Sequence, residues 1–209
     1  MGEYYYLMAQ LPYLMYDKKP PMSSEKFKEL ASSQLNKADA SFLEHLSLDI
    51  EGYADTSDSD SSENTMGAYS GPQGETYATG CDFVDRWNDW ERTLRLNLAR
   101  HRSLKLYPNK TYTIDPPVVP DDAYAAAALV FTQDGSPLDG ELLLDKARWN
   151  AIDLMTGNDY FHENNVYAYY LKLLILERRE LFDAEKGFAE YKSLYAQIFE
   201  RSHNRQQES

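Results

Sequence analysis

Large apolar residues recur every three or four positions along the longest regular stretches of the chain, a pattern that predicts amphipathic α-helices. The clearest stretch is residues 81–106, where steps of four, three, four and four place one set of large side chains on a single helix face. This set comprises Phe83, Trp87, Trp90, Leu94 and Leu98. We expect the helix to bury that face in a core.

A second long pattern runs through residues 162–202, as one helix or as two nearly collinear helices that break near residues 183–187. Its apolar seam has steps of three and four and one charged interruption, Glu177. The seam comprises Tyr167, Tyr170, Leu174, Leu181, Ala184, Phe188, Tyr191, Tyr195 and Ile198. Two interpretations stay open: a helical hairpin inside one bundle, or a coiled coil with a partner, which includes a homodimer through this C-terminal helix.

Shorter patterns complete an all-α domain. Residues 23–36 begin with a serine N-cap and keep helical spacing, and a second helix is expected after Asp39. The acidic start and the alanines of residues 121–131 predict another short helix. Residues 141–155 are amphipathic, through Leu142, Leu143, Trp149, Ile152 and Leu154. The chain is therefore predicted to form a single, mainly helical bundle over residues 1–209.

The remaining segments lack a helical pattern. Residues 53–79 are rich in Ser, Asp and Gly and poor in aliphatic residues, which predicts a long, disordered acidic loop. A calcium loop is disfavoured there, because Glu63 stands where the EF-hand turn needs glycine. Residues 107–120 contain four prolines and predict a connector, residues 132–140 predict a turn, and residues 203–209 predict a loose tail.

The composition indicates the cellular compartment of the protein and disfavours some classes of binding partner. The chain of 209 residues carries one cysteine, Cys81, so it has no internal disulfide and no cysteine-based zinc site. Its formal net charge of -13 opposes binding to nucleic acid or to an anionic membrane. The opening EYYYLMAQLPYLMY has no basic leader and is interrupted by Gln10 and Pro12. We therefore expect this opening to belong to the folded body of a cytoplasmic protein.

Catalytic motifs are not recognised in the sequence. No glycine-rich phosphate loop precedes a Lys-Ser or Lys-Thr pair. His162 and Glu163 resemble the start of a metalloprotease helix, but Val166 stands where the second histidine is required. The carboxylates look like parts of solvated helix faces. The prediction is a non-catalytic protein with no catalytic, cofactor-binding or metal site.

The helix predicted at residues 81–106 concentrates positive charge in an otherwise acidic chain. Its candidate partner-binding residues are Arg92, Arg95, Arg100 and Arg102. Two interpretations are open. The arginines dock an acidic partner, or they pair with the chain's own carboxylates and cover apolar surface with their stems.

Three stretches together carry a resemblance to a known family: EYYYLMAQLPYLMYDKKPPMSSEKF, FVDRWNDWERTLRLNLARHRSLKL and FHENNVYAYYLKLLILERRELFDAEKGF. They resemble an uncharacterised bacterial family whose genes lie within V-type ATPase operons. That family is in turn faintly similar to the funnel subunit of V-type and archaeal ATPases, the all-helical protein that seats the rotary shaft on the membrane ring.

The resemblance implies a non-catalytic subunit or assembly factor that couples the soluble motor to its membrane ring. The implied partners are other V-type ATPase subunits, namely the central shaft and the membrane ring, and the protein would be peripheral at the inner membrane through that complex. On this reading Tyr4, Tyr5 and Tyr6 face a partner subunit or the lipid headgroup region, and the alternative is ordinary burial in the core of this protein. Glu163 and Asn164 match the Glu-Asn opening of helices in the funnel subunit. The alternative function is a small-molecule-binding helical module or enzyme with an aromatic-lined pocket.

Overall fold

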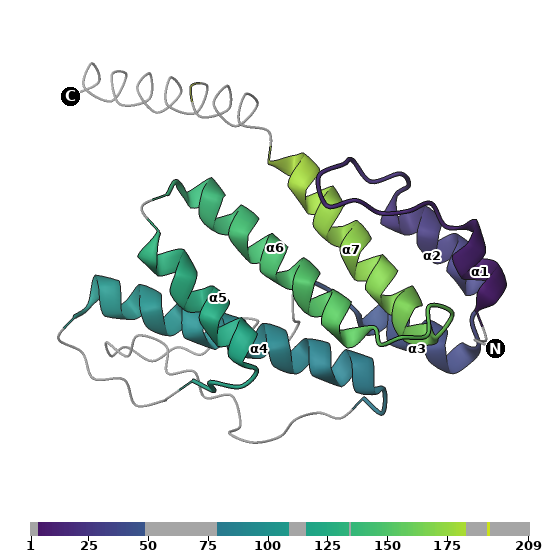
Figure 1. The fold of residues 1–209 in the computed structure, drawn as a ribbon, viewed down its shortest axis with the longest axis horizontal. Coiled ribbons are helices and arrows are strands. Elements are labelled where there is room, and N and C mark those ends of the chain that lie inside the picture. Colours follow the sequence, from purple (N-terminus) through teal and green to yellow (C-terminus); the bar gives the residue numbers. More distant parts are fainter. Residues whose placement is uncertain (1–3, 49–78, 109–115, 134, 183–191, 193–209) are drawn as a thin grey trace, which may run out of the picture.

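The computed structural model describes residues 4–48, 79–108, 116–133, 135–182 and 192. These residues form seven α-helices and no strand, so the predicted all-α class is confirmed (Figure 1). The helices are α1 (Tyr5–Gln10), α2 (Ser24–Ser32), α3 (Lys37–His45), α4 (Asp82–Leu106), α5 (Asp121–Thr132), α6 (Pro137–Met155) and α7 (Glu163–Leu181). Most of the predicted acidic loop at 53–79 and all of the predicted tail at 203–209 lie outside the described residues.

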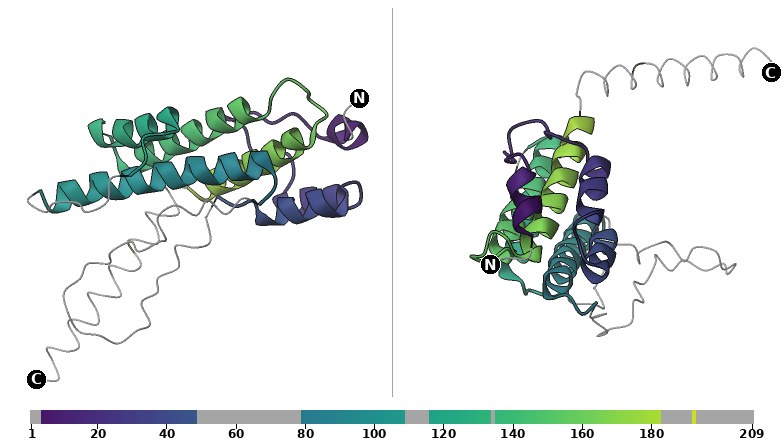
Figure 2. Two further views of the ribbon diagram at one scale, coloured as in Figure 1. Left: turned by 90° about the horizontal axis from the view of Figure 1, so that it is seen from below. Right: turned by 90° about the vertical axis from the view of Figure 1, so that its right-hand side faces the viewer.

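Helices α4 to α7 form an ordered stack in which each helix packs against the next along the chain. The links from α5 to α6 and from α6 to α7 are short, so these neighbours run antiparallel (Figure 1). Helices α2 and α3 pack on the far side of α7, which therefore lies between them and α6 (Figure 2). The short helix α1 lies at the end of the bundle where α6 leads into α7.

The core of the stack is the face of α4 that its periodicity predicts. All five predicted residues, Phe83, Trp87, Trp90, Leu94 and Leu98, are buried. The Trp87 and Trp90 rings are parallel, with centroids 5.9 Å apart. The indole N–H of Trp87 donates to the Ser47 carbonyl (3.1 Å), and that of Trp90 donates to the Asp122 carboxylate (2.7 Å). These two bonds tie α4 to the segment after α3 and to the start of α5.

Helix α7 is buried on more than one face, because it has neighbours on two sides. Its buried residues are Val166, Tyr167, Ala168, Tyr169, Tyr170, Leu171, Leu173, Ile175 and Leu176. Within the predicted seam, Tyr167 and Tyr170 pack inside this protein, and Leu181 is exposed. The seam residues from Ala184 onward lie outside the described part of the chain, so a homodimer through this helix stays a prediction.

Helix α6 differs from its predicted pattern. Of the five residues predicted to form its buried face, Ile152 is buried, three are half-buried, and Leu154 is 75% exposed. The buried face instead comprises Leu144, Asp145, Arg148, Ala151, Ile152 and Met155. The prediction was wrong because two charged residues of this face are paired in the interior, and hydrophobicity alone does not detect such a face.

Two helices also begin earlier than predicted, because polar residues cap them. Helix α6 starts at Pro137, inside the predicted turn, where Ser136 and Asp139 form a capping box. Helix α3 starts at Lys37 because the Asn36 side chain accepts a hydrogen bond from the Asp39 amide (2.8 Å). In both cases the cap sets the boundary.

Replacing Ser136 with alanine is expected to lower the free energy of unfolding by about 1 kcal/mol, because the Asp139 amide loses its acceptor. Urea denaturation measures this change. Ser41→Ala is the matched control, since Ser41 is an exposed position within α3 and does not cap it. Equal stability of the two variants would contradict a role for the capping box.

No helix in the described ranges combines the length and the apolar character that crossing a membrane requires.

Candidate functional site

One end of the bundle gathers aromatic residues from α1, from the connector after it, and from the turn between α6 and α7. The Tyr4 amide donates to the Phe161 carbonyl (3.2 Å), and the Tyr5 and Phe161 rings lie 4.7 Å apart. These contacts fix α1 to the residues that precede α7. The structure therefore brings the predicted residues Tyr4, Tyr5 and Tyr6 to the same end as Glu163 and Asn164, which open α7 (Figure 1).

The three consecutive tyrosines have different environments. Tyr4 is buried, and its hydroxyl donates to the Asp39 carboxylate and accepts from the Asn36 amide nitrogen (3.1 Å). Tyr5 is 48% exposed and Tyr6 is 77% exposed. Tyr4 is therefore an anchor between α1 and α3, while Tyr5 and Tyr6 present ring surface to solvent.

Glu163 and Asn164 make contacts at the start of α7. The Glu163 carboxylate lies 3.1 Å from His162 Nδ1, and the same nitrogen accepts a hydrogen bond from the Asn164 amide (3.4 Å). His162 is thus the N-cap residue of α7. Glu163 and Asn164 thus form the first turn of α7 and contact its N-cap residue, next to the aromatic residues.

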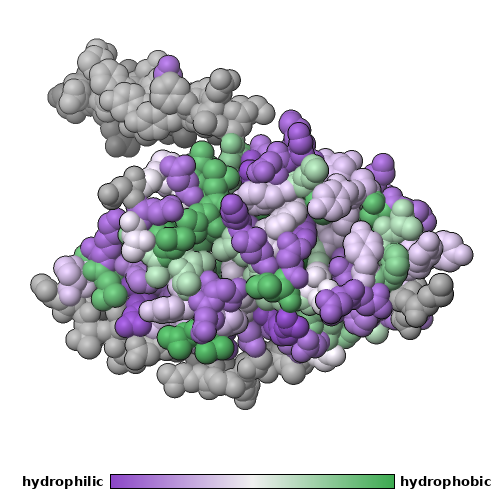
Figure 3. All heavy atoms as spheres, in the orientation of Figure 1, coloured by the Kyte–Doolittle hydropathy of each residue, from purple (hydrophilic) through white to green (hydrophobic). Residues whose placement is uncertain are grey.

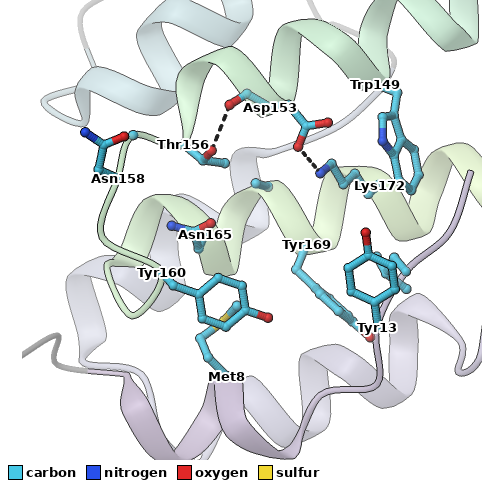
Figure 4. A pocket seen from close by; sticks show the side chains of 13 residues that line it. Met8, Tyr13, Trp149, Asp153, Thr156, Asn158, Tyr160, Asn165, Tyr169 and Lys172 are labelled. Atoms are coloured by element: carbon cyan, nitrogen blue, oxygen red, sulfur yellow. Dashed lines mark hydrogen bonds and ion pairs between the residues drawn. The ribbon is translucent and has the colours of Figure 1, made fainter.

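A groove of about 340 Å³ opens beside α1 (Figure 4). Its apolar lining combines Met8 and Leu14 with Tyr13, Trp149, Tyr160 and Tyr169. Tyr13 and Tyr160 are both more than half exposed, and they lie over the groove from two different segments of the chain. An aromatic-lined pocket is the alternative that the sequence suggested, but the sequence did not indicate which residues line it, because the walls are about 150 residues apart and meet through tertiary packing.

Several polar groups of the groove are bound within the protein. The Lys172 ammonium pairs with the Asp153 carboxylate and lies 4.9 Å from the centre of the Trp149 ring. The Tyr169 hydroxyl donates to the Pro12 carbonyl (2.9 Å), and burial raises its pKa to about 12. The groove therefore presents a nearly neutral, aromatic surface.

The lining of the groove offers ring surface and a few polar side chains. It contains Asp153, Thr156 and Lys172 and no serine, cysteine or histidine. Among the described residues, no three His, Cys, Asp or Glu side chains are placed to hold a metal ion. A neutral aromatic surface on a fixed backbone can bind side chains of another molecule.

The predicted arginine face of α4 does not form one surface with the aromatic residues. Arg95 is used inside the protein, since it pairs with Glu91 (3.2 Å) and donates to the Leu48 carbonyl. Arg92 and Arg100 are half-buried, and Arg102 is exposed. Arg100 and Arg102 belong to the last turns of α4, at the end of the bundle opposite α1 (Figure 1). The predicted interface is thus divided between two ends.

A buried ionic cluster joins α4 and α6. Arg148 pairs with Glu91 and with Asp145 (3.1 Å), and all three side chains are almost completely buried. Arg178 of α7 lies 3.8 Å from Asp145. Burial raises the pKa of Asp145, although Arg178 and Arg148 act to lower it. The expectation that the carboxylates lie on solvated faces is therefore wrong for Glu91 and Asp145.

Residues 119–202 match the model of a family described as a protein of unknown function, DUF2764. Within the described residues this match spans α5, α6 and α7. No curated protein and no solved structure matches the chain.

Proposed function

We propose that this protein is a non-catalytic interaction subunit that binds a component of a V-type ATPase through its aromatic end. The aromatic end is defined by Tyr5, Tyr6, Tyr13, Tyr160 and Phe161. The observation that carries the proposal is the concentration of exposed rings on a fixed part of the bundle. The choice of partner rests on the sequence resemblance described above.

The rings of the aromatic end form a nearly continuous surface. Successive ring centroids are 5.8 Å apart from Tyr6 to Tyr5, 4.7 Å from Tyr5 to Phe161 and 5.4 Å from Phe161 to Tyr160. Tyr13, which is 81% exposed, lines the groove that Tyr160 also lines. Single exposed hydrophobic residues are common on protein surfaces, but a contiguous group of this kind is typical of an interaction site.

The backbone beneath these rings is held in place before a partner arrives. Tyr4 is anchored to Asp39 and Asn36, and the hydroxyl of Tyr169 binds the Pro12 carbonyl in the connector after α1. Binding then requires little further ordering, which favours affinity. Tyrosine also combines a large contact area with a polar tip, so it suits an interface that is partly hydrated.

In the proposed role the protein hydrolyses nothing. Its packed helices hold the geometry between the soluble motor and the membrane ring, and the aromatic end contacts one of those parts. A rigid all-α body suits this task, because closely packed interiors transmit strain with little compression.

The experiment is capture of tagged protein from its native host at low salt, followed by mass spectrometry. Recovery of V-type ATPase shaft or ring subunits is expected. The double variant Tyr6→Ser with Tyr13→Ser should lower recovery more than tenfold, because truncating buried interface residues typically costs about 2 kcal/mol or more at a hot spot.

The matched control replaces Tyr124 and Val118 with serine, since both are exposed and lie away from the aromatic end. It should bind as the parent protein does. A preparation that contains no ATPase subunits would contradict the choice of a V-type ATPase as the partner. Equal losses of recovery in the two double variants would show that the aromatic end is not the binding surface.

A second candidate function is binding of a small molecule in the groove beside α1. The observation that favours it is the combination of about 340 Å³ with a Trp149, Tyr13 and Tyr160 lining. Native mass spectrometry of the same tagged protein separates the two functions. A ligand that copurifies with the protein and is released on denaturation supports this candidate. A native mass equal to that of the protein chain alone argues against it.

A further inference from the structure

The face of α4 that packs into the core changes from apolar to basic residues near the C-terminal end of the helix. After Leu94 and Leu98 the same face continues, at steps of four and three, with Arg102 and Lys105. Leu94 and Leu98 are buried, whereas the two basic residues are exposed. The stripe therefore passes from an apolar core to a basic surface without leaving its face of the helix.

This basic part of α4 lines a second groove, of about 320 Å³, between α4, α5 and the start of α6. Its apolar lining comprises Leu98, Val130, Phe131 and Leu144. On the face shown in Figure 3, hydrophobic side chains gather over α5 and the first half of α6. The exposed Leu129 of α5 and Leu138 of α6 add apolar surface to these two helices. We call this groove the basic groove.

The charges of the basic groove are not balanced within the described residues. Neither Arg102 nor Lys105 makes an ion pair with a residue that the structure describes. The carboxylate that lines the groove, Glu141, is bound to Arg178 (2.6 Å). Two such cations beside an apolar floor stand out in a chain whose formal net charge is -13.

We infer that the basic groove docks an amphipathic helix of a partner protein, with acidic side chains three or four residues apart beside an apolar stripe. Arg102 and Lys105 are three residues apart and so lie one above the other on α4. A partner helix with the same spacing of carboxylates can meet both cations while its apolar stripe covers Phe131 and Val130. This inference goes beyond the proposed function, because the basic groove lies on the last turns of α4, at the end of the bundle opposite the aromatic end.

The chemistry of the groove favours an acidic protein helix over a nucleic acid. Its floor is apolar, which phosphate groups of a nucleic acid would not cover, and the overall negative charge repels them. Charge complementarity then selects an acidic partner.

The experiment places a photo-crosslinking amino acid at Gln133, an exposed residue that lines the groove, in the full chain expressed in its native host. The control position is Glu29, an exposed residue of α2. Mass spectrometry of the crosslinked peptide identifies the occupant. The expected peptide comes from another protein and contains acidic residues three or four apart next to leucine-like residues.

Charge reversal supplies the second readout. Arg102→Glu with Lys105→Glu should lower the crosslink yield from Gln133 at least tenfold, and added salt should lower the yield of the parent protein. Lys26→Glu with Lys146→Glu changes the net charge equally at exposed positions outside the groove and should leave the yield unchanged. Circular dichroism checks that both variants keep their helices.

Three results overturn the inference: a crosslink within the same chain or to a second copy, a partner peptide without the acidic pair, or equal yields from the two charge-reversed variants. Its failure is distinguishable from that of the proposed function. ATPase subunits captured by the tagged protein without an acidic helix at Gln133 would refute the inference alone. An acidic helix crosslinked at Gln133, with no ATPase subunit captured by the tagged protein, would refute the proposed function alone.

Discussion

Replacing Arg148 with alanine is expected to lower the free energy of unfolding by about 3–5 kcal/mol, because two buried carboxylates lose the guanidinium that joins them, leaving Glu91 with Arg95 and Asp145 with Arg178. Arg148 is 4% exposed, and its guanidinium binds both Glu91 and Asp145. One oxygen of Asp145 already lacks a hydrogen-bond partner among the described residues. The loss of Arg148 would therefore leave Asp145 dependent on Arg178, which is 3.8 Å away.

Urea denaturation at neutral pH measures this loss. Lys146→Ala is the control, because Lys146 is exposed on the same helix, and its removal should change stability by no more than about 0.5 kcal/mol. A loss below about 1 kcal/mol for Arg148→Ala would mean that water solvates Glu91 and Asp145 in the variant. That result would contradict a closed interface between α4 and α6.

Replacing Trp87 with alanine is expected to cost a similar amount, about 3–5 kcal/mol, for a different physical reason. The Trp87 side chain is completely buried against Trp90, so its removal opens a cavity beside the N-terminal part of α4. The substitution also removes the donor to the Ser47 carbonyl. Both effects loosen the contact between α4 and the segment after α3.

Trp87→Phe separates the two effects, since phenylalanine refills much of the volume but cannot donate a hydrogen bond. Its loss should be clearly smaller than that of Trp87→Ala. The dependence of unfolding on urea should stay the same in both variants, which shows that the exposed area on unfolding has not changed. Equal losses for alanine and phenylalanine would assign the whole effect to the hydrogen bond.

The contrast between α4 and α6 explains how far the sequence predicts this fold. On α4 the large residues Phe83, Trp87 and Trp90 define the buried face, so periodicity finds it. On α6 the buried face includes Asp145 and Arg148, whose burial depends on Glu91 in another helix. Periodicity describes one segment at a time and cannot supply that partner.

The candidate site shows the same limit. The N-terminal tyrosines were selected from the sequence, but not the different roles of Tyr4 and Tyr6, because burial of Tyr4 depends on Asp39. The facing wall, with Trp149 and Tyr160, comes from segments far along the chain. The aromatic residues in the turn before α7 are visible in the sequence. Their role in lining the groove becomes clear only from their contact with α1 in the folded structure.

The position of α7 between α6 and the pair α2 and α3 has a consequence for synthesis of the chain. The surface that α2 and α3 cover belongs to residues 163–181, more than a hundred positions later. During translation these N-terminal helices leave the ribosome long before that surface exists. Short helices without packing partners are marginal in water. Helices α2 and α3 are thus made well before α7 and dock only once α7 is present, and Phe27 and Leu43 lack their packing surface in the interval.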